Sequence, residues 1–292
     1  MRGYADASKH QKDDERFNPE AASLPYRFTE LVERSAPGAR PLLEKRLIVP
    51  YSGIAAMAEL RDYDSLERNC SAWIQPLLQH FMEERGATTV KIAASQALKS
   101  LAQSLLNRMV VNYLLTGRAP RVGELRFLPR GKAPWIELFL DPRIMPEEVD
   151  FDPDKGPSEL FQLSITIENI VNVLHAALGR RKTPKPVFFS SVALAILSPL
   201  MVARRHGAHP QEVASLMRRL LPALGKDINS GVVWRQRVLD GRTEYAPRRK
   251  ACCLKYALPD KPHLCSTCSR RPETLFFEKV PVLGGHDTAD GR

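Results

Sequence analysis

The sequence predicts a mainly α-helical protein with a small β-hairpin, an α+β fold, followed by a cysteine-rich C-terminal module. Apolar residues recur at helical spacing in several long stretches, they alternate in one short segment, and four of the five cysteines lie between positions 252 and 268. The chain has 292 residues, of which 43% are hydrophobic and 26% are charged, as in soluble globular proteins. It is long enough to bury a core without disulfide bonds.

We divide the chain into four parts. Residues 1–22 are polar and lack the apolar run of a secretory signal, so we expect a disordered N-terminus. Residues 23–245 form the expected helical body, with its best internal boundary in the acidic, proline-rich loop 141–157. The cysteine module spans residues 246–275, and residues 276–292 form a tail.

Three stretches have the pattern of amphipathic or buried helices. Residues 89–117 are rich in alanine and leucine and end on Gly117, a residue suited to close a helix. Residues 160–178 carry apolar side chains at helical spacing. Pro210 suits the first turn of a third helix that ends at Gly225, and Pro222 is expected to kink or shorten its last turn.

Residues 187–203 form the most apolar window, with 13 apolar residues among 17. The window is at the lower length limit of a membrane span, and it contains three serines and Pro199. We therefore expect a buried core helix rather than a membrane span, in a cytoplasmic protein.

A different pattern occurs between the first two helices. Leu125 and Phe127, then Ile136, Leu138 and Leu140, alternate with other residues on either side of the turn at 129–132. Alternation around a Pro- and Gly-containing turn predicts a β-hairpin.

Several common catalytic motifs are absent from the sequence. It has no phosphate-binding loop, no dinucleotide-binding fingerprint, no H-E-x-x-H and no G-x-S-x-G. The seven histidines are scattered, and we expect His175, within an apolar helical stripe, to be structural rather than a ligand. Cys70 is far from the other cysteines and is expected to be a small buried side chain.

The remaining cysteines, Cys252, Cys253, Cys265 and Cys268, have the spacing C-C-x11-C-x2-C. The C-x-x-C turn can direct two sulfurs to one centre, but the side chains of a vicinal pair usually diverge. A single zinc ion is normally held by two closely spaced pairs, whereas a two-iron cluster has two separated metal centres. The spacing therefore favours iron–sulfur ligation, with a zinc site or unligated thiols as alternatives.

Most of the excess positive charge surrounds these cysteines. The formal net charge is +10, and residues 235–271 contain ten basic and three acidic residues, a net +7. Cations near an anionic cluster raise its reduction potential, and a basic surface can dock an acidic protein. Six basic residues lie next to the cysteines in the sequence and could raise the reduction potential of a cluster or dock an electron donor. Alternatively, they are simply solvated. They are Arg248, Arg249, Lys250, Lys255, Arg270 and Arg271.

The cysteine pattern resembles that of the FhuF-type ferric-siderophore reductases. Their signature is a vicinal cysteine pair followed by C-x-x-C near the C-terminus, which together hold a [2Fe-2S] cluster. Here ACCLKYALP and LCSTC carry the resemblance, over about 25 residues. The gap of eleven residues is one longer than is usual in the family, and Ser269 stands where a proline commonly follows the last cysteine.

The resemblance implies an iron–sulfur oxidoreductase. Cys252, Cys253, Cys265 and Cys268 would be the [2Fe-2S] ligands, and residues 23–245 would be the siderophore-binding body. The cluster would transfer one electron at a time to Fe(III) in a siderophore of hydroxamate type, so that Fe(II) is released in the cytoplasm. Since the chain has no flavin or nicotinamide motif, a ferredoxin or flavoprotein reductase would supply the electrons. Nucleic acid is not expected as a partner, and membrane association is at most peripheral, at the inner face of the cytoplasmic membrane.

Two alternatives remain open from the sequence. A four-cysteine zinc protein could bind nucleic acid through the basic C-terminal tract, with an affinity that falls steeply with salt. An iron–sulfur redox sensor without a substrate would share the cysteines but show no turnover.

Overall fold

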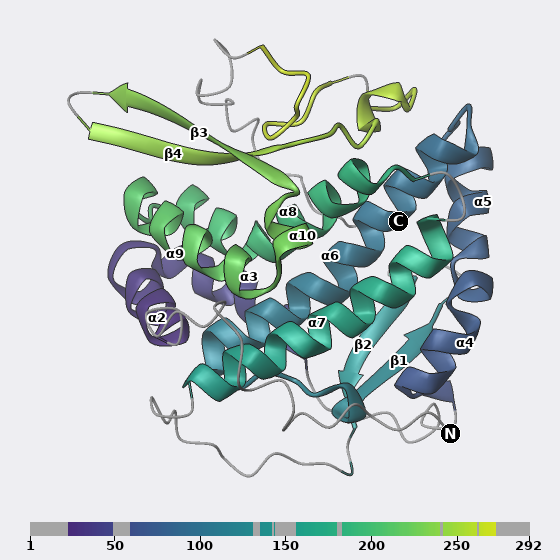
Figure 1. Cartoon of the computed structure of the whole chain (residues 1–292), viewed down its shortest axis with the longest axis horizontal. Helices are drawn as coiled ribbons and strands as arrows, with labels where there is room; N and C mark the ends of the chain where they lie inside the picture. Colours follow the sequence, from purple (N-terminus) through teal and green to yellow (C-terminus); the bar gives the residue numbers. More distant parts are fainter. Residues whose placement is uncertain are drawn as a thin grey trace.

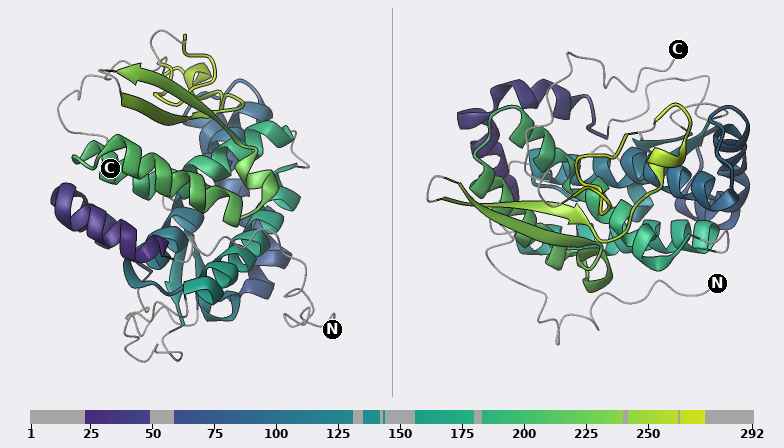
Figure 2. Two further views of the ribbon diagram at one scale, coloured as in Figure 1. Left: turned by 60° about the vertical axis from the view of Figure 1, so that its left-hand side comes forward. Right: turned by 90° about the horizontal axis from the view of Figure 1, so that it is seen from above.

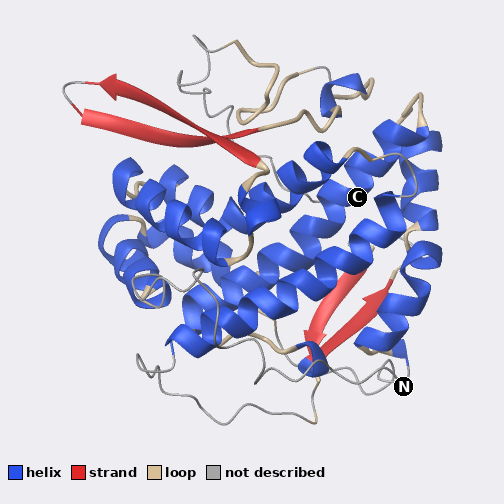
Figure 3. Ribbon diagram, in the orientation of Figure 1, coloured by secondary structure: helices blue, strands red, loops and turns tan. Residues whose placement is uncertain are grey.

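A computed structural model describes residues 23–48, 59–130, 135–141, 143, 156–179, 183–239, 242–261 and 263–272. The predicted N-terminal segment 1–22, the tail 276–292 and most of the loop 141–157 lie outside this description. The described chain is mainly helical with two antiparallel hairpins, which confirms the α+β prediction (Figure 1 and Figure 3).

The helices pack around one core, and the hairpins lie on different sides of it (Figure 2). Their bounds are α2 (Leu24–Ser35), α3 (Arg40–Glu44), α4 (Tyr63–Trp73), α5 (Gln75–Glu83), α6 (Val90–Thr116), α7 (Gly156–Gly179), α8 (Lys185–Arg205), α9 (Pro210–Ala223) and α10 (Lys226–Asn229). Short 3-10 turns occur at Pro37–Ala39, Val122–Glu124 and Lys255–Ala257. The strands are β1 (Leu125–Pro129), β2 (Ile136–Leu140), β3 (Val232–Leu239) and β4 (Arg242–Arg249).

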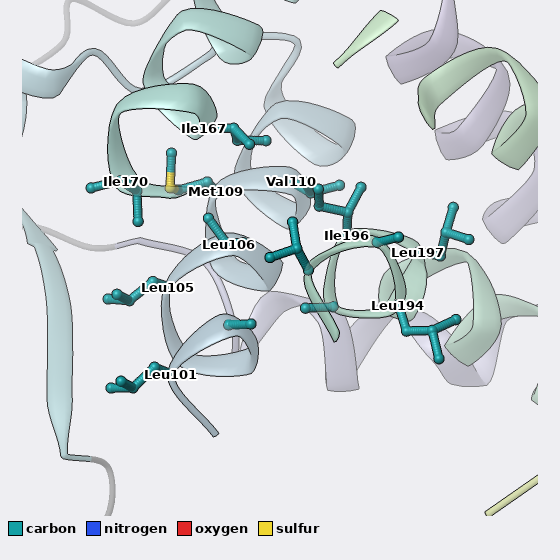
Figure 4. Packing of buried hydrophobic residues seen from close by; sticks show 14 of the residues in the cluster. Leu101, Leu105, Leu106, Met109, Val110, Ile167, Ile170, Leu194, Ile196 and Leu197 are labelled. Carbon is teal, nitrogen blue, oxygen red and sulfur yellow. The ribbon is translucent and has the colours of Figure 1, made fainter. Parts of the chain in front are cut away.

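Helix α6 is the central element of the core, as its sequence predicts. The Thr89 side chain caps it by accepting a hydrogen bond from the Ile92 N–H at 3.3 Å, and Gly117 ends it in the left-handed conformation at φ 73°. Its side chains are buried on nearly all sides because α2, α5, α7 and α8 surround it. Figure 4 shows Met109 of α6 beside Ile170 of α7, and Val110 of α6 near Ile196 of α8.

Helix α8 contains the most apolar window of the sequence. In the described part of the chain it is the one helix long and apolar enough to cross a membrane, and 78% of that window is buried inside the protein. It packs against α6, α7 and α9, so the core-helix interpretation agrees with its surroundings. Its apolar surface is interrupted by three serines, Ser190, Ser191 and Ser198.

The first hairpin was predicted and the second was not. Strands β1 and β2 pair with Phe127 opposite Leu138, in agreement with the alternation of the sequence. Strands β3 and β4 pair with Trp234 opposite Pro247 and Gln236 opposite Tyr245. Arginines and a proline obscure the alternation of this second hairpin. The expected start of the cysteine module, residue 246, falls within β4.

The β3–β4 hairpin lies over α8 and α9, and the cysteine segment that follows it lies beside the hairpin (Figure 1 and Figure 2). Gly231, at the start of the hairpin, makes this close approach sterically feasible. A Cβ atom at this position would lie 2.2 Å from the Phe189 carbonyl oxygen and 2.5 Å from its carbon, both backbone atoms of α8. The hairpin can therefore stay on α8 only if residue 231 has no side chain.

We predict that Gly231→Ala lowers the free energy of unfolding by about 1–3 kcal/mol, since a rigid helix backbone cannot move aside. Gly123→Ala is the matched control, because nothing lies within 4 Å of a Cβ atom there. Chemical denaturation of both variants measures the difference. Equal stabilities would show that the hairpin moves off α8 at no cost.

Candidate metal centre

The four C-terminal cysteines converge in space. The sulfurs of Cys252 and Cys268 are 3.5 Å apart, and the Cys253 thiol is within hydrogen-bonding range of the thiols of both Cys252 and Cys265. Two thiolates at about 2.3 Å from one tetrahedral metal would be about 3.7 Å apart, so the Cys252–Cys268 spacing is close to that of two shared ligands. Cys253 and Cys268 are buried, and Cys252 and Cys265 are half-buried.

The four thiols are linked in series: Cys268 contacts Cys252, and hydrogen bonds connect Cys252 to Cys253 and Cys253 to Cys265. Within the described residues, no group of three or more His, Cys, Asp or Glu side chains is placed to hold a metal ion. The candidate donor set is the four thiols, without a histidine or carboxylate.

Hydrogen bonding among the thiols separates their acidities. The thiols of Cys252 and Cys265 donate to Cys253, which holds the pKa of Cys253 below its usual range. The same hydrogen bonds, together with burial, raise the pKa of Cys252 and of Cys265.

The backbone beside the cysteines directs N–H groups at sulfur. Leu254 has φ 60°, and in the described part of the chain it is the one non-glycine residue in the left-handed region, which is strained for a leucine. Its N–H donates to the Cys252 sulfur at 3.4 Å, and the Arg270 N–H donates to the Cys268 sulfur at 3.4 Å. Such hydrogen bonds stabilise thiolates and raise the potential of iron–sulfur clusters.

Two core helices hold this segment through polar side chains. From α6, the Ser95 hydroxyl donates to the Cys253 carbonyl oxygen at 2.9 Å, and the Gln96 amide donates to the same oxygen. From α8, the Ser190 hydroxyl donates to the Gly231 carbonyl oxygen at 2.7 Å and accepts from the Ala251 N–H at 3.1 Å. Ser95, Gln96 and Ser190 are buried, and a buried polar side chain needs a hydrogen-bond partner. Each of them finds that partner in the backbone of residues 231–253.

Arg248 clamps the C-x-x-C turn from β4. Its guanidinium group donates to three backbone carbonyl oxygens, those of Cys268 at 3.2 Å, Ser269 at 2.6 Å and Arg271 at 2.5 Å. The Arg249 N–H adds a backbone hydrogen bond to the Thr267 carbonyl at 2.9 Å. The turn carrying Cys265 and Cys268 is therefore held by an interior arginine, which is only 9% exposed.

A group of cations lies next to the sulfurs. The buried guanidinium of Arg249 donates to the Ser191 hydroxyl at 3.0 Å, while its Nε atom is buried with no hydrogen-bond partner among the described residues. Its positive charge favours the thiolate forms of Cys253 and Cys265, although hydrogen bonding and burial raise the pKa of Cys265 overall. The positive charge of Lys99, on α6, interacts electrostatically with Cys253, Cys265 and Lys255. The site thus combines several positive charges with four thiols.

The other predicted basic residues have different surroundings. Lys250 and Arg270 are exposed, and Arg270 lies over the Tyr256 ring at 4.9 Å. Arg271 is half-buried and contributes its carbonyl oxygen to the Arg248 clamp. The six predicted residues therefore divide into a buried pair, Arg248 and Arg249, a half-buried pair, Lys255 and Arg271, and an exposed pair, Lys250 and Arg270.

Sequence reasoning missed Ser95, Gln96, Lys99, Ser190 and Ser191. The one sequence feature that could have indicated these residues is that each places a polar side chain in an apolar helix. A buried polar side chain there needs a hydrogen-bond partner from another element. Cys70 agrees with its prediction, because it is buried in the core and burial raises its pKa to about 12. His175 is an exposed helix residue whose ring packs edge-on against Phe188, with 4.8 Å between ring centres.

An open hollow of about 440 Å³ lies between α9 and β4. Arg218 sits over the Tyr245 ring at 5.0 Å, and both line the hollow. The lining residues are Gln211, Ala214, Ser215, Arg218, Arg219 and Tyr245. This combination of guanidinium, hydroxyl and amide groups suits a ligand rich in oxygen atoms.

Comparisons of the chain with protein-family models, curated proteins and solved structures found no match. The functional argument therefore rests on the chemistry of the site.

We predict that Arg248→Met destabilises the C-x-x-C turn by about 1.5–3 kcal/mol, the range for hydrogen bonds made by a charged group. Limited proteolysis should cut within residues 263–272 faster, while the helical body keeps its far-ultraviolet circular dichroism. Arg270→Met is the control, since Arg270 is exposed and its side chain lies over Tyr256. If both variants resist proteolysis equally, Arg248 does not hold the turn.

Proposed function

We propose that this protein is a [2Fe-2S] oxidoreductase that passes single electrons to siderophore-bound Fe(III). Cys252, Cys253, Cys265 and Cys268 would hold the cluster, which supplies one-electron exchange when bound. The observation that carries the proposal is the convergence of four thiols from two sequence-distant pairs beside interior cations.

The residues present fit such a group. Four thiolates and an oxidised two-iron core carry a net charge of about −2, and one added electron makes it about −3. Arg249 is buried with an unsatisfied Nε atom in the described structure, and an anion beside it would offset the cost of burying this charge. A two-iron cluster needs four thiolates in total, which is the number of thiols that this segment supplies.

The chain's own residues would position and protect the centre. Arg248 holds the C-x-x-C turn, and Ser95 with Gln96 fixes the Cys253 carbonyl. The N–H groups of Leu254 and Arg270 donate to the two sulfurs of the Cys252–Cys268 pair. Burial of Cys253 and Cys268 limits the access of water to these ligands.

The proposed substrate is a ferric siderophore, with a hydroxamate type as the first to test. Hard oxygen ligands hold Fe(III) much more tightly than Fe(II), so one electron releases the iron and leaves the chelator intact. The hollow between α9 and β4 presents donors to oxygen-rich ligands, and β4 leads from it directly to Arg248 and the cysteines. We therefore propose this hollow as the place where the chelate binds.

A separate protein would deliver the electrons. The chain lacks a dinucleotide-binding fingerprint, and the exposed residues around the cysteines include Lys250, Lys261 and Arg270. A basic surface favours the approach of an acidic donor, such as a ferredoxin or a flavoprotein reductase. Free thiols of this kind persist in a reducing compartment, which makes the cytoplasm the proposed location.

The first measurement is an anaerobic visible spectrum with iron, sulfide and zinc analysis. We expect charge-transfer bands and about two irons and two sulfides per chain. Dithionite should bleach the bands, and a ferric hydroxamate should restore them as Fe(II) appears. A colourless protein with one zinc would overturn the proposal in favour of a zinc protein. A cluster that no ferric siderophore reoxidises would leave a redox sensor.

We predict that Cys252→Ser or Cys265→Ser abolishes the cluster, because each removes one thiolate of a pair. The helical body should stay folded by circular dichroism, since neither residue belongs to its core. Cys70→Ser is the matched control and should keep full iron, because Cys70 is buried far along the chain from the site. If either variant kept the wild-type iron content, the assignment of that cysteine as a cluster ligand would be wrong.

A further inference from the structure

Lys99 approaches the cysteine segment from α6. Ser95 and Gln96 donate hydrogen bonds to the Cys253 carbonyl, and Lys99 follows them by four and three residues. Residues at these spacings share one face of a helix. The same face of α6 that fixes Cys253 therefore carries a lysine.

The surroundings of Lys99 are unusual for a lysine. Its side chain is partly buried, and burial, followed by the charge of Lys255, lowers its pKa. The charges that act on it come from Lys255, Cys253, Arg249 and Cys265, and none of these is a carboxylate. Among the described residues, no hydrogen bond or ion pair holds its ammonium group. Burying several cations together without an anion costs free energy, so we expect an anion at the sulfurs.

Resting on the proposed function, we propose that Lys99 is a positioning residue that sets the reduction potential of the cluster. Its ammonium group, together with Arg249, would stabilise the negative charge that one electron adds on the side of Cys253 and Cys265. The donor protein supplies the electron to the cluster, and the cluster passes it to Fe(III), which becomes Fe(II). Lys99 gains or loses no proton and forms no covalent bond in this transfer.

The physical basis is long-range Coulomb attraction, which acts between Lys99 and the cluster without a hydrogen bond. The reduced state carries one more negative charge than the oxidised state, so a nearby cation stabilises the reduced state more. Removing the cation should make reduction harder, whereas a substitution that keeps the charge should preserve the potential.

The test is a potentiometric titration of the holoprotein, followed by visible absorbance and electron paramagnetic resonance. We expect Lys99→Met to lower the equilibrium constant for one-electron reduction about tenfold, a shift of about 59 mV to lower potential. Lys99→Arg should restore the wild-type potential. Lys91→Met is the control, because Lys91 is an exposed lysine at the start of the same helix.

Failure of this inference and failure of the proposed function give different results. Wild-type protein without iron and sulfide would overturn the proposed function, and this inference with it. A fully loaded Lys99→Met protein with the wild-type potential would overturn the role of Lys99 alone. Lys99→Gln removes the charge with a polar side chain, so the potential can be measured even where Lys99→Met does not assemble.

Discussion

The cysteine segment depends on polar side chains that project from two apolar helices. Ser95 and Gln96 of α6 bind the Cys253 carbonyl, and Ser190 and Ser191 of α8 bind the backbone at Ala251 and the Arg249 guanidinium. In a buried environment each of these groups must find a partner, because an unpaired one costs about 1–3 kcal/mol. The helical core therefore specifies where the cysteines lie, and the position of the sulfurs follows from the packing of α6 against α8.

Charge gives this arrangement its chemical character. Interior arginines and a lysine surround thiols, whereas the acidic residue in the same loop, Asp260, pairs with Arg85 at the protein surface. Arg248 and Arg249 are buried, and a low dielectric makes their positive charge more effective. Structural and electrostatic roles also divide between neighbours, because Arg248 holds carbonyl oxygens while Arg249 acts on the sulfurs of Cys253 and Cys265.

The elements predicted best are those whose physical cause is local. Helix α6 begins at Thr89 and ends at Gly117 as capping chemistry requires, and β1 pairs with β2 as their alternation indicates. The β3–β4 hairpin was missed because arginines and Pro247 replace the usual alternation, and its stability comes from contact with α8 and α9. Gly231 shows the same limit, since only the Phe189 carbonyl above it explains why a glycine is needed.

The sequence by itself determined the mainly helical class, the first hairpin and the candidate ligands, because periodicity, capping and cysteine spacing are short-range properties. Only the tertiary structure decided which sulfurs are neighbours, which of the six basic residues are interior, and that Lys99 shares the α6 face that binds the Cys253 carbonyl. Some of these features arise between residues 16 apart, such as Cys252 and Cys268, and others between residues 157 apart, such as Gln96 and Cys253. No local pattern encodes such a contact, since it forms when apolar helices pack and their few polar groups must be satisfied together.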